Sequence, residues 1–312
     1  MTTAAIGQFQ TLVDLVCKKS PLQKKKLAGY LLAQDSEFFS EAEQFAARYR
    51  TFLDAQGISI EEAVNAYLKM CSDMMRCQVA FMRTGRYPTL DAASATEHVY
   101  HNPREMVSYM IGLAISQFLW ETHRAMFQFF SRNIHACAAN IQSYLEIGPG
   151  HGLFLDRALA DLRPSTAVTV VDISPTSMQI TRSIMEHFRP DARSIKYENA
   201  DILDLPINET FDFITMGEVL EHVDVPDTLL KKLHLLLSPE GRAFISTCAN
   251  CPALDHVYQF NNVGEIREMI RTCGLDIEED AALPVEKLPM TEIVEKKITI
   301  NYCAMVKRHG SI

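Results

Sequence analysis

The sequence predicts an α/β fold, in which helices cover a mostly parallel β-sheet, preceded by an all-helical segment. Three observations support this prediction. Apolar residues recur at helical spacing over residues 1–140, with hardly a strand signal. From residue 141, short β-branched runs alternate with helical patterns, which is typical of a parallel sheet. A glycine-rich stretch directly follows the first of these runs. We therefore expect two domains, a helical cap over 1–140 and a sheet domain over 141–312.

The helical segment contains an amphipathic run at residues 61–83. The helical spacing of its apolar residues predicts that they lie on one buried face of a helix. The residues expected on that side are Ala63, Tyr67, Met70, Met74 and Val79.

A second helix is predicted to start at Asn102 as N-cap, with Pro103 in its first turn and Glu105 completing a capping box. The following residues are apolar nearly all round as far as Phe130. We therefore expect one long helix there, sandwiched between layers of the structure.

The strand signals after residue 141 are short and separated by helical patterns. In a sheet of this kind, ligands gather at the carboxyl ends of the strands. The runs expected to be strands are 143–147, 167–173, 194–198, 211–216, 241–247 and 298–306.

Composition limits the kinds of partner. No apolar run among the 312 residues reaches the roughly 18 that a membrane span needs. The first twenty residues lack the pattern of a signal peptide, so we expect a cytoplasmic protein without a membrane. The formal net charge of −9 argues against nucleic acid as a partner.

The eight cysteines are scattered, as in a protein with reduced buried thiols rather than a disulfide framework. Cys248 and Cys251 form the one Cys-x-x-Cys pair. A single pair is weak evidence for zinc or for redox chemistry. We therefore expect no metal site.

The first predicted strand ends in Glu146, followed by Gly148, Gly150 and Gly152 in alternate positions. The third glycine comes one residue too early for the dinucleotide-binding pattern G-x-G-x-x-G. The turn still lets a ligand approach bare backbone and directs amide groups at an anion, which a carboxylate could supply as well as a phosphate. His151 within the turn either contacts that anion or points to solvent.

Acidic residues follow the next two strands. Asp172 ends the second strand, twenty residues beyond Gly152, where a carboxylate can accept hydrogen bonds from both hydroxyls of a ribose. Asp201 follows the third strand and could accept from an adenine amino group. Gly217 ends the fourth strand and indicates another close approach to the backbone.

With these motifs in order, the sequence resembles class I S-adenosylmethionine-dependent methyltransferases, particularly the small-molecule branch that includes ubiquinone-pathway O-methyltransferases. The resemblance covers about residues 141–306. It rests on the glycine turn, Asp172, Asp201 and the stretch GEVLEHV from Gly217. It implies a Rossmann-like, seven-stranded sheet with an antiparallel last strand, and S-adenosylmethionine as the cofactor.

The resemblance also implies roles for residues in the rim, the loops that follow the carboxyl ends of the predicted strands. The three glycines would border the methionine part of the cofactor, and Gly217 would face its sulfonium. The residues expected to bind the cofactor are Glu146, Gly148, Gly150, Gly152, Asp172, Ile173, Asp201, Ile202 and Gly217.

Methyl transfer to a hydroxyl or ammonium needs a base, and histidine is the natural candidate near neutral pH. His256 is the preferred candidate because it follows the fifth strand beside the polar Asp255, although these two residues could equally cap a turn. His222 is the second candidate and could instead be an ordinary helix-face residue. Tyr109, Trp120 and Asp255 are the residues expected to bind the acceptor. Tyr109 and Trp120 could line its pocket or contact the sulfonium through cation–π interactions, although such aromatic residues are more often core.

Three functions compete at this stage. The first is methyl transfer to a small molecule of specialised metabolism. The second is use of the same cofactor's aminobutyrate chain, by transfer or cyclisation, with release of methylthioadenosine. The third is a non-catalytic cofactor-binding partner protein. The methionines and aromatic residues of the helical half could also form a homodimer interface.

Overall fold

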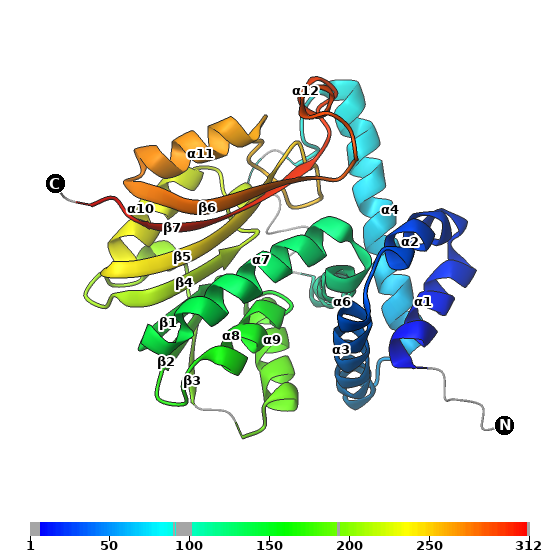
Figure 1. The fold of residues 1–312 in the computed structure, drawn as a ribbon, viewed down its shortest axis with the longest axis horizontal. Helices are drawn as coiled ribbons and strands as arrows, with labels where there is room; N and C mark the ends of the chain where they lie inside the picture. Colours follow the sequence, from blue (N-terminus) through cyan, green and yellow to red (C-terminus); the bar gives the residue numbers. More distant parts are fainter. Residues whose placement is uncertain (1–6, 90, 92–101, 192–193, 311–312) are drawn as a thin grey trace.

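The computed structural model describes residues 7–89, 91, 102–191 and 194–310, and in this part of the chain a helical layer stands beside a seven-stranded sheet (Figure 1). The strand order is β3-β2-β1-β4-β5-β7-β6. The strands are β1 (Ser143–Ile147), β2 (Ala167–Asp172), β3 (Ile195–Asn199), β4 (Phe211–Gly217), β5 (Leu237–Ala249), β6 (Leu275–Pro284) and β7 (Ile300–Arg308). The predicted fold class is therefore confirmed.

Most helices of the amino-terminal half begin at a side-chain cap. Asp35, Ser59 and Asn102 each accept a hydrogen bond from a backbone N–H of the first turn, and Ser59 forms a full capping box. No helix in the described residues is both long and apolar enough to cross a membrane. These helices are α1 (Gln8–Lys19), α2 (Pro21–Leu32), α3 (Ser36–Ala55), α4 (Ile60–Thr84), α6 (Pro103–Leu119) and α7 (Glu121–Cys137).

The helices of the sheet half connect successive strands. Among them, α9 begins at a Ser174 cap with Pro175 in its first turn. The elements are α8 (Leu153–Asp161), α9 (Pro175–Phe188), α10 (Pro226–Leu236), α11 (Val263–Thr272) and α12 (Met290–Glu295), with short 3₁₀ turns at Ala138–Asn140, Ile202–Asp204 and Leu220–His222.

Strand β7 runs antiparallel between β5 and β6, so the implied antiparallel last strand is confirmed. Strand β6 had no counterpart among the six runs identified in the sequence. It lies at the edge of the sheet, pairs with β7 alone among the described strands and is mostly half-buried. Its acidic stretch Glu278–Asp280 therefore resembles a solvated loop rather than a strand of the core.

Two predictions within the helical half were wrong. Val79 points to solvent rather than to the buried side of α4. The expected single long helix is interrupted at Trp120, which adopts an extended conformation (φ −117°, ψ 124°) between α6 and α7. Trp120 Nε1 donates to Tyr67 Oη of α4 at 2.9 Å. This break lets α6 stay with α4 while α7 turns onto the sheet.

The two faces of the sheet are covered differently. Helices α10 and α11 cover one face and share a core with β4, β5 and β7. Helices α7, α8 and α9 cover the other, whose core continues without interruption into α1, α3, α4 and α6. Phe130 of α7 contacts Phe154 of α8 and Phe244 of β5, with ring centroids 4.9 and 5.0 Å apart. The helical layer is thereby fixed to the sheet.

Replacing Phe130 tests this junction. Phe130 is fully buried, so Phe130→Ala should lower the free energy of unfolding by about 3–5 kcal/mol, as is usual for such truncations. Urea denaturation followed by circular dichroism measures the change. Leu32→Ala, at a residue that is 87% exposed, is the control and should change stability by less than about 0.5 kcal/mol. Equal effects of the two substitutions would contradict this assignment of the core.

Candidate functional site

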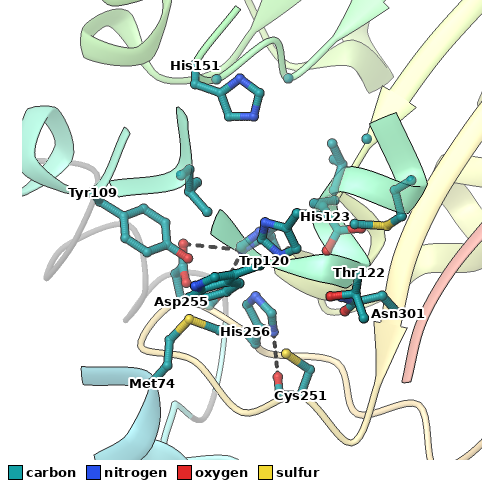
Figure 2. A pocket seen from close by; sticks show the side chains of 18 of the residues that line it. Met74, Tyr109, Trp120, Thr122, His123, His151, Cys251, Asp255, His256 and Asn301 are labelled. Atoms are coloured by element: carbon teal, nitrogen blue, oxygen red, sulfur yellow. Dashed lines mark hydrogen bonds and ion pairs between the residues drawn. The ribbon is translucent and has the colours of Figure 1, made fainter. Parts of the chain in front are cut away.

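A cavity of about 1610 Å³ lies between the carboxyl edge of the sheet and helices α4, α6 and α7 (Figure 2). Pockets that hold one drug-sized ligand usually measure roughly 300–1,000 Å³. The cavity therefore has room for a nucleoside-sized molecule and a second ligand beside it. Both halves of the chain contribute to its wall.

The glycine turn forms one part of the wall. Gly148, Gly150 and Gly152 have φ angles of 63°, 50° and 69°, in the left-handed region that favours glycine. A Cβ atom on Gly148 would lie 2.9 Å from Val219 Cγ2, so a larger residue would crowd the turn. Gly148 and Gly150 line the cavity, whereas Gly152 begins α8 and faces Met185 of α9.

Asp172 and Asp201 lie along the same rim. Asp172 is buried; its Oδ1 accepts from the Ser174 backbone N–H at 2.8 Å and its Oδ2 accepts from Ser177 Oγ at 2.6 Å. Burial raises its pKa above the usual range. An ionised carboxylate offers about four lone pairs, so each Asp172 oxygen can accept one further hydrogen bond. Asp201 accepts from the Leu203 N–H at 2.9 Å.

The remaining predicted cofactor residues also line the cavity. Ile173 is 65% exposed and Ile202 is buried, and both present apolar side chains to the cavity beside Asp172 and Asp201. Gly217 ends β4 at the same edge.

Glu146 is a buried carboxylate at the end of β1. Tyr144 donates a hydrogen bond to its Oε2, and Tyr144 Oη also lies 2.8 Å from Thr215 Oγ1. Burial raises the pKa of Glu146 to about 8 despite these bonds. The side chain therefore titrates near neutral pH.

The helical side of the cavity is apolar with a few neutral polar groups. Tyr109 and Trp120, two candidates from the sequence for the acceptor pocket, line this cavity. His151 is buried and its ring is directed into the cavity in Figure 2, which overturns the solvent alternative. Burial lowers the pKa of His151 to about 4 and that of His123 to about 3, so both rings are neutral at pH 7.

Gln117 of α6 approaches the glycine turn from the helical side, with its Nε2 3.4 Å from His151 Nε2. Its Oε1 is buried and has no hydrogen-bond partner among the described residues. An unsatisfied buried acceptor is costly unless a ligand supplies a donor. This oxygen therefore marks a place for a donor such as an ammonium group.

The two predicted catalytic histidines meet at the opposite end of the cavity. His222 comes from the turn after β4, and its Nδ1 lies 3.0 Å from the carbonyl oxygen of Asp255 and 3.6 Å from Asp255 Oδ2. His256 comes from the loop after β5, and its Nδ1 donates to the carbonyl of Cys251 at 2.6 Å. The two rings are 4.9 Å apart and nearly perpendicular. Tertiary structure thus joins residues that lie 34 positions apart in the sequence.

Acids and thiols surround these histidines. Glu221 Oε2 accepts from Thr247 Oγ1 at 2.7 Å, while its Oε1 has no partner among the described residues. Burial and the nearby Glu221 raise the pKa of Glu218, and burial raises that of Glu221. The neighbouring Cys251 and Glu221 help to raise the pKa of His256 to about 10 in spite of its burial.

The thiols of Cys248 and Cys251 are close enough to share a hydrogen bond, which raises the pKa of Cys248 and lowers that of Cys251. Sequence reasoning gave Glu218, Glu221 and these cysteines no place in the site. The signals were present: two acids in GEVLEH, and a Cys-x-x-Cys pair five residues before His256. Neither pattern reveals that the two loops meet.

The rim suits S-adenosylmethionine, which combines a nucleoside with a cationic amino-acid tail. Asp172 can accept hydrogen bonds from the ribose hydroxyls. The glycine turn presents backbone without side chains to the amino-acid tail. Gln117 Oε1 lacks a hydrogen-bond donor among the described residues, which the ammonium group of the tail would supply. The donor set therefore fits the cofactor that the sequence motifs imply.

Comparison with known families decides the class of protein. A family model described as a methyltransferase domain matches residues 121–278, half of the chain. The chain belongs to this family. The match starts at α7, so it includes the helix that packs on the sheet. The protein is an S-adenosylmethionine-dependent methyltransferase.

Curated relatives agree with this assignment. The methyltransferase is 25% identical over 181 residues to the ubiquinone biosynthesis O-methyltransferase of Xanthomonas euvesicatoria pv. vesicatoria (strain 85-10), an alignment that covers 51% of this chain and 73% of the relative. The same identity and coverage hold for the enzyme of that name from Xanthomonas campestris pv. campestris (strain B100).

Solved structures share the fold over a longer part of the chain. An O-methyltransferase family protein from Burkholderia thailandensis superposes with a TM-score of 0.54 at 13% identity, over 81% of this chain and 73% of that one. The mitomycin 7-O-methyltransferase MmcR gives a TM-score of 0.53 at 12% identity, over 80% and 70%. At these identities the likeness concerns the fold alone.

The raised pKa of Glu146 predicts a pH-dependent stability for the methyltransferase without ligand. Burial raises the pKa of Glu146 from its ordinary value of 4.5 to about 8 in the folded protein, so its contribution to stability is fully present below pH 4.5 and is lost as the pH rises through 8. The slope in this window approaches about 1.4 kcal/mol per pH unit. Glu146→Gln should remove this part of the decline, so the variant gains stability relative to wild type between pH 5 and pH 8.

Urea denaturation at several pH values measures the effect. The exposed Glu268→Gln serves as a matched control and should follow wild type. Parallel profiles for wild type and Glu146→Gln would show that Glu146 does not titrate in this window.

Proposed function

We propose that the methyltransferase methylates a hydroxyl of a predominantly apolar small molecule, whose reacting end lies beside His222. The observation that carries this proposal is that the two ends of the cavity carry different groups. One end has carboxylates and the glycine turn, the other has two histidines, and apolar side chains of the helices line the wall between them. The curated relatives are named as O-methyltransferases, which supports oxygen as the attacked atom.

The cofactor is proposed to lie along the rim. Asp172 would accept from the ribose hydroxyls, and Asp201 with Ile202 and Ile173 would hold the adenine. Gly148 and Gly150 would border the amino-acid tail, with Gln117 Oε1 accepting from its ammonium. Gly217 would face the sulfonium, and Glu146 would support the turn from below. When bound, S-adenosylmethionine supplies a methyl group on sulfur that a nucleophile displaces in line.

The helical half is proposed to be a cap that holds the acceptor, with its boundary near residue 140. Methionine side chains are flexible and adapt to irregular apolar shapes, which suits a bulky acceptor. Tyr109 and Trp120 would flank the acceptor in this pocket. The methionines of its wall are Met74, Met75, Met82, Met106, Met110 and Met126.

His222 is proposed to accept the proton of the acceptor hydroxyl. Its Nδ1 is held by the Asp255 carbonyl, a bond that assigns the proton to Nδ1 and leaves Nε2 as the basic nitrogen. His256 was the preferred base from the sequence, but its Nδ1 is engaged by the Cys251 carbonyl and its side chain is more deeply buried. We therefore assign His256 a positioning role beside His222. A homodimer through the helical half remains a prediction.

Asp172→Asn tests the cofactor site. The substitution keeps the shape of the side chain but removes the charge that strengthens hydrogen bonds to ribose. Hydrogen bonds to charged groups contribute about 1.5–3 kcal/mol each, so affinity for S-adenosylmethionine should fall roughly 10- to 100-fold. Isothermal titration calorimetry measures it. Asp204→Asn, at an exposed acid three residues after Asp201 that does not line the cavity, is the matched control. Equal affinity in all three proteins would remove Asp172 from the site.

His222→Gln tests the base. Turnover should fall by about 10²- to 10⁴-fold, the usual contribution of a general base, while affinity for the cofactor stays within about twofold of wild type. Transfer of a labelled methyl group to acceptors in a metabolite extract measures turnover, and mass spectrometry identifies the product. His135→Gln, at an exposed histidine of α7, is the control. Unchanged turnover in His222→Gln would exclude the residue as base.

A further inference from the structure

Three buried side chains with metal-binding atoms converge beneath the histidine end of the cavity. Cys248 ends β5, and Cys251 and His256 follow in the next loop. One ligand atom from each lies within 4.8 Å of the other two, and Cys248 Sγ is 3.8 Å from His256 Nδ1. All three residues are buried, with exposed fractions of 0% for Cys248, 7% for Cys251 and 5% for His256. In Figure 2, Cys251 and His256 face one another across the floor of the cavity.

A carboxylate from a different loop lies beside two members of this group. Glu221 is fully buried. One of its carboxylate oxygens lies within 4.8 Å of a ring nitrogen of His256, and one lies within 4.8 Å of Cys248 Sγ. Its Oε1 has no hydrogen-bond partner among the described residues. A buried carboxylate oxygen without a partner is costly, and a cation would satisfy it.

The ionisable groups of these two loops also suit a cation. Glu218 and Glu221 lie close to Cys248, and no lysine or arginine of the described residues forms an ion pair with either acid. Burial disfavours the ionised forms of both acids, as their raised pKa values show, and a bound divalent cation would favour these forms.

The backbone on both sides of the cluster is strained. Glu218 and Asn250 have φ angles of 53° and 51°, in the left-handed region that residues other than glycine seldom adopt. They follow β4 and β5, the two strands whose loops carry the cluster. Strain of this kind costs about 1–3 kcal/mol per residue and gathers at functional sites.

We propose that Cys248, Cys251, His256 and Glu221 bind one zinc ion at the floor of the cavity. Two thiolates and an imidazole select soft or borderline metals over magnesium and calcium. Tetrahedral zinc with S and N ligands at about 2.3 and 2.05 Å requires an S–N separation near 3.6 Å, close to the 3.8 Å between Cys248 and His256. Zinc binding at Nδ1 would release the proton that Nδ1 donates to the Cys251 carbonyl, so the metal bond would replace this hydrogen bond.

The ion would act on catalysis by positioning. It joins the loop after β5 to the turn after β4, and the Asp255 carbonyl that orients His222 lies in that loop. This consequence rests on the proposed function, whereas the metal site does not. Loss of the ion should therefore lower turnover and leave affinity for S-adenosylmethionine unchanged.

Metal content tests the site directly. Tag-free methyltransferase, incubated with Zn²⁺ and then gel-filtered, should retain about one zinc ion per chain by mass spectrometry of the metal. Co²⁺ in its place should give thiolate-to-metal charge-transfer absorption. The double variant Cys248→Ser/Cys251→Ser should lose both signals. Cys273→Ser, at a buried cysteine after α11, should keep them.

The outcomes separate the two proposals. Absence of retained zinc and of a cobalt–thiolate band in folded wild-type protein would overturn the metal site, whatever the turnover. Binding of Mg²⁺ without Zn²⁺, or zinc that persists in the double variant, would also overturn it. Calorimetry with S-adenosylmethionine on the same samples tests the cofactor site separately, and circular dichroism shows whether the double variant folds.

Discussion

The packing of α7 on the sheet is the constraint on which the rest of the structure depends. Phe130 inserts between Phe154 and Phe244, so the helical layer and the sheet share one apolar core. Because interiors of this kind are close-packed, the contact fixes the helical layer against the sheet. Residues of α4, α6 and α7 and of the carboxyl edge of the strands line the cavity. Without the extended residue Trp120, α6 and α7 would be collinear and could not both pack in this way.

Electrostatics divide this cavity into two ends. Near the glycine turn, buried histidines are neutral and the acids have neighbouring donors, as at Asp172. Beyond β4, buried acids, thiols and histidines crowd together, and two residues adopt strained backbone conformations. A cationic cofactor suits the first end. The second end has the histidines that proton transfer needs and the thiols, imidazole and carboxylate that a metal needs. The low local dielectric strengthens electrostatic interactions there.

Sequence alone determined those features that depend on residues close together in the chain. Caps such as Asn102, the glycine turn after β1 and Asp172 at a strand end are local patterns, because helix starts, tight turns and strand ends are set by a few neighbouring residues. Their order along the chain was enough to identify the family and its cofactor. The edge strand β6 escaped notice because its half-exposed acidic residues lack the pattern of a buried strand.

Tertiary structure decided what depends on distant residues. The break at Trp120 carries no proline or glycine signal; it accompanies a hydrogen bond to Tyr67 and the docking of α7, both contacts with remote parts of the chain. In the same way, the loops after β4 and β5 meet because their strands pair in parallel and end at the same edge. Glu221 and His222 thereby come to lie beside Cys251 and His256. Local sequence fixes the conformation of each loop, but only the register between strands brings their side chains together.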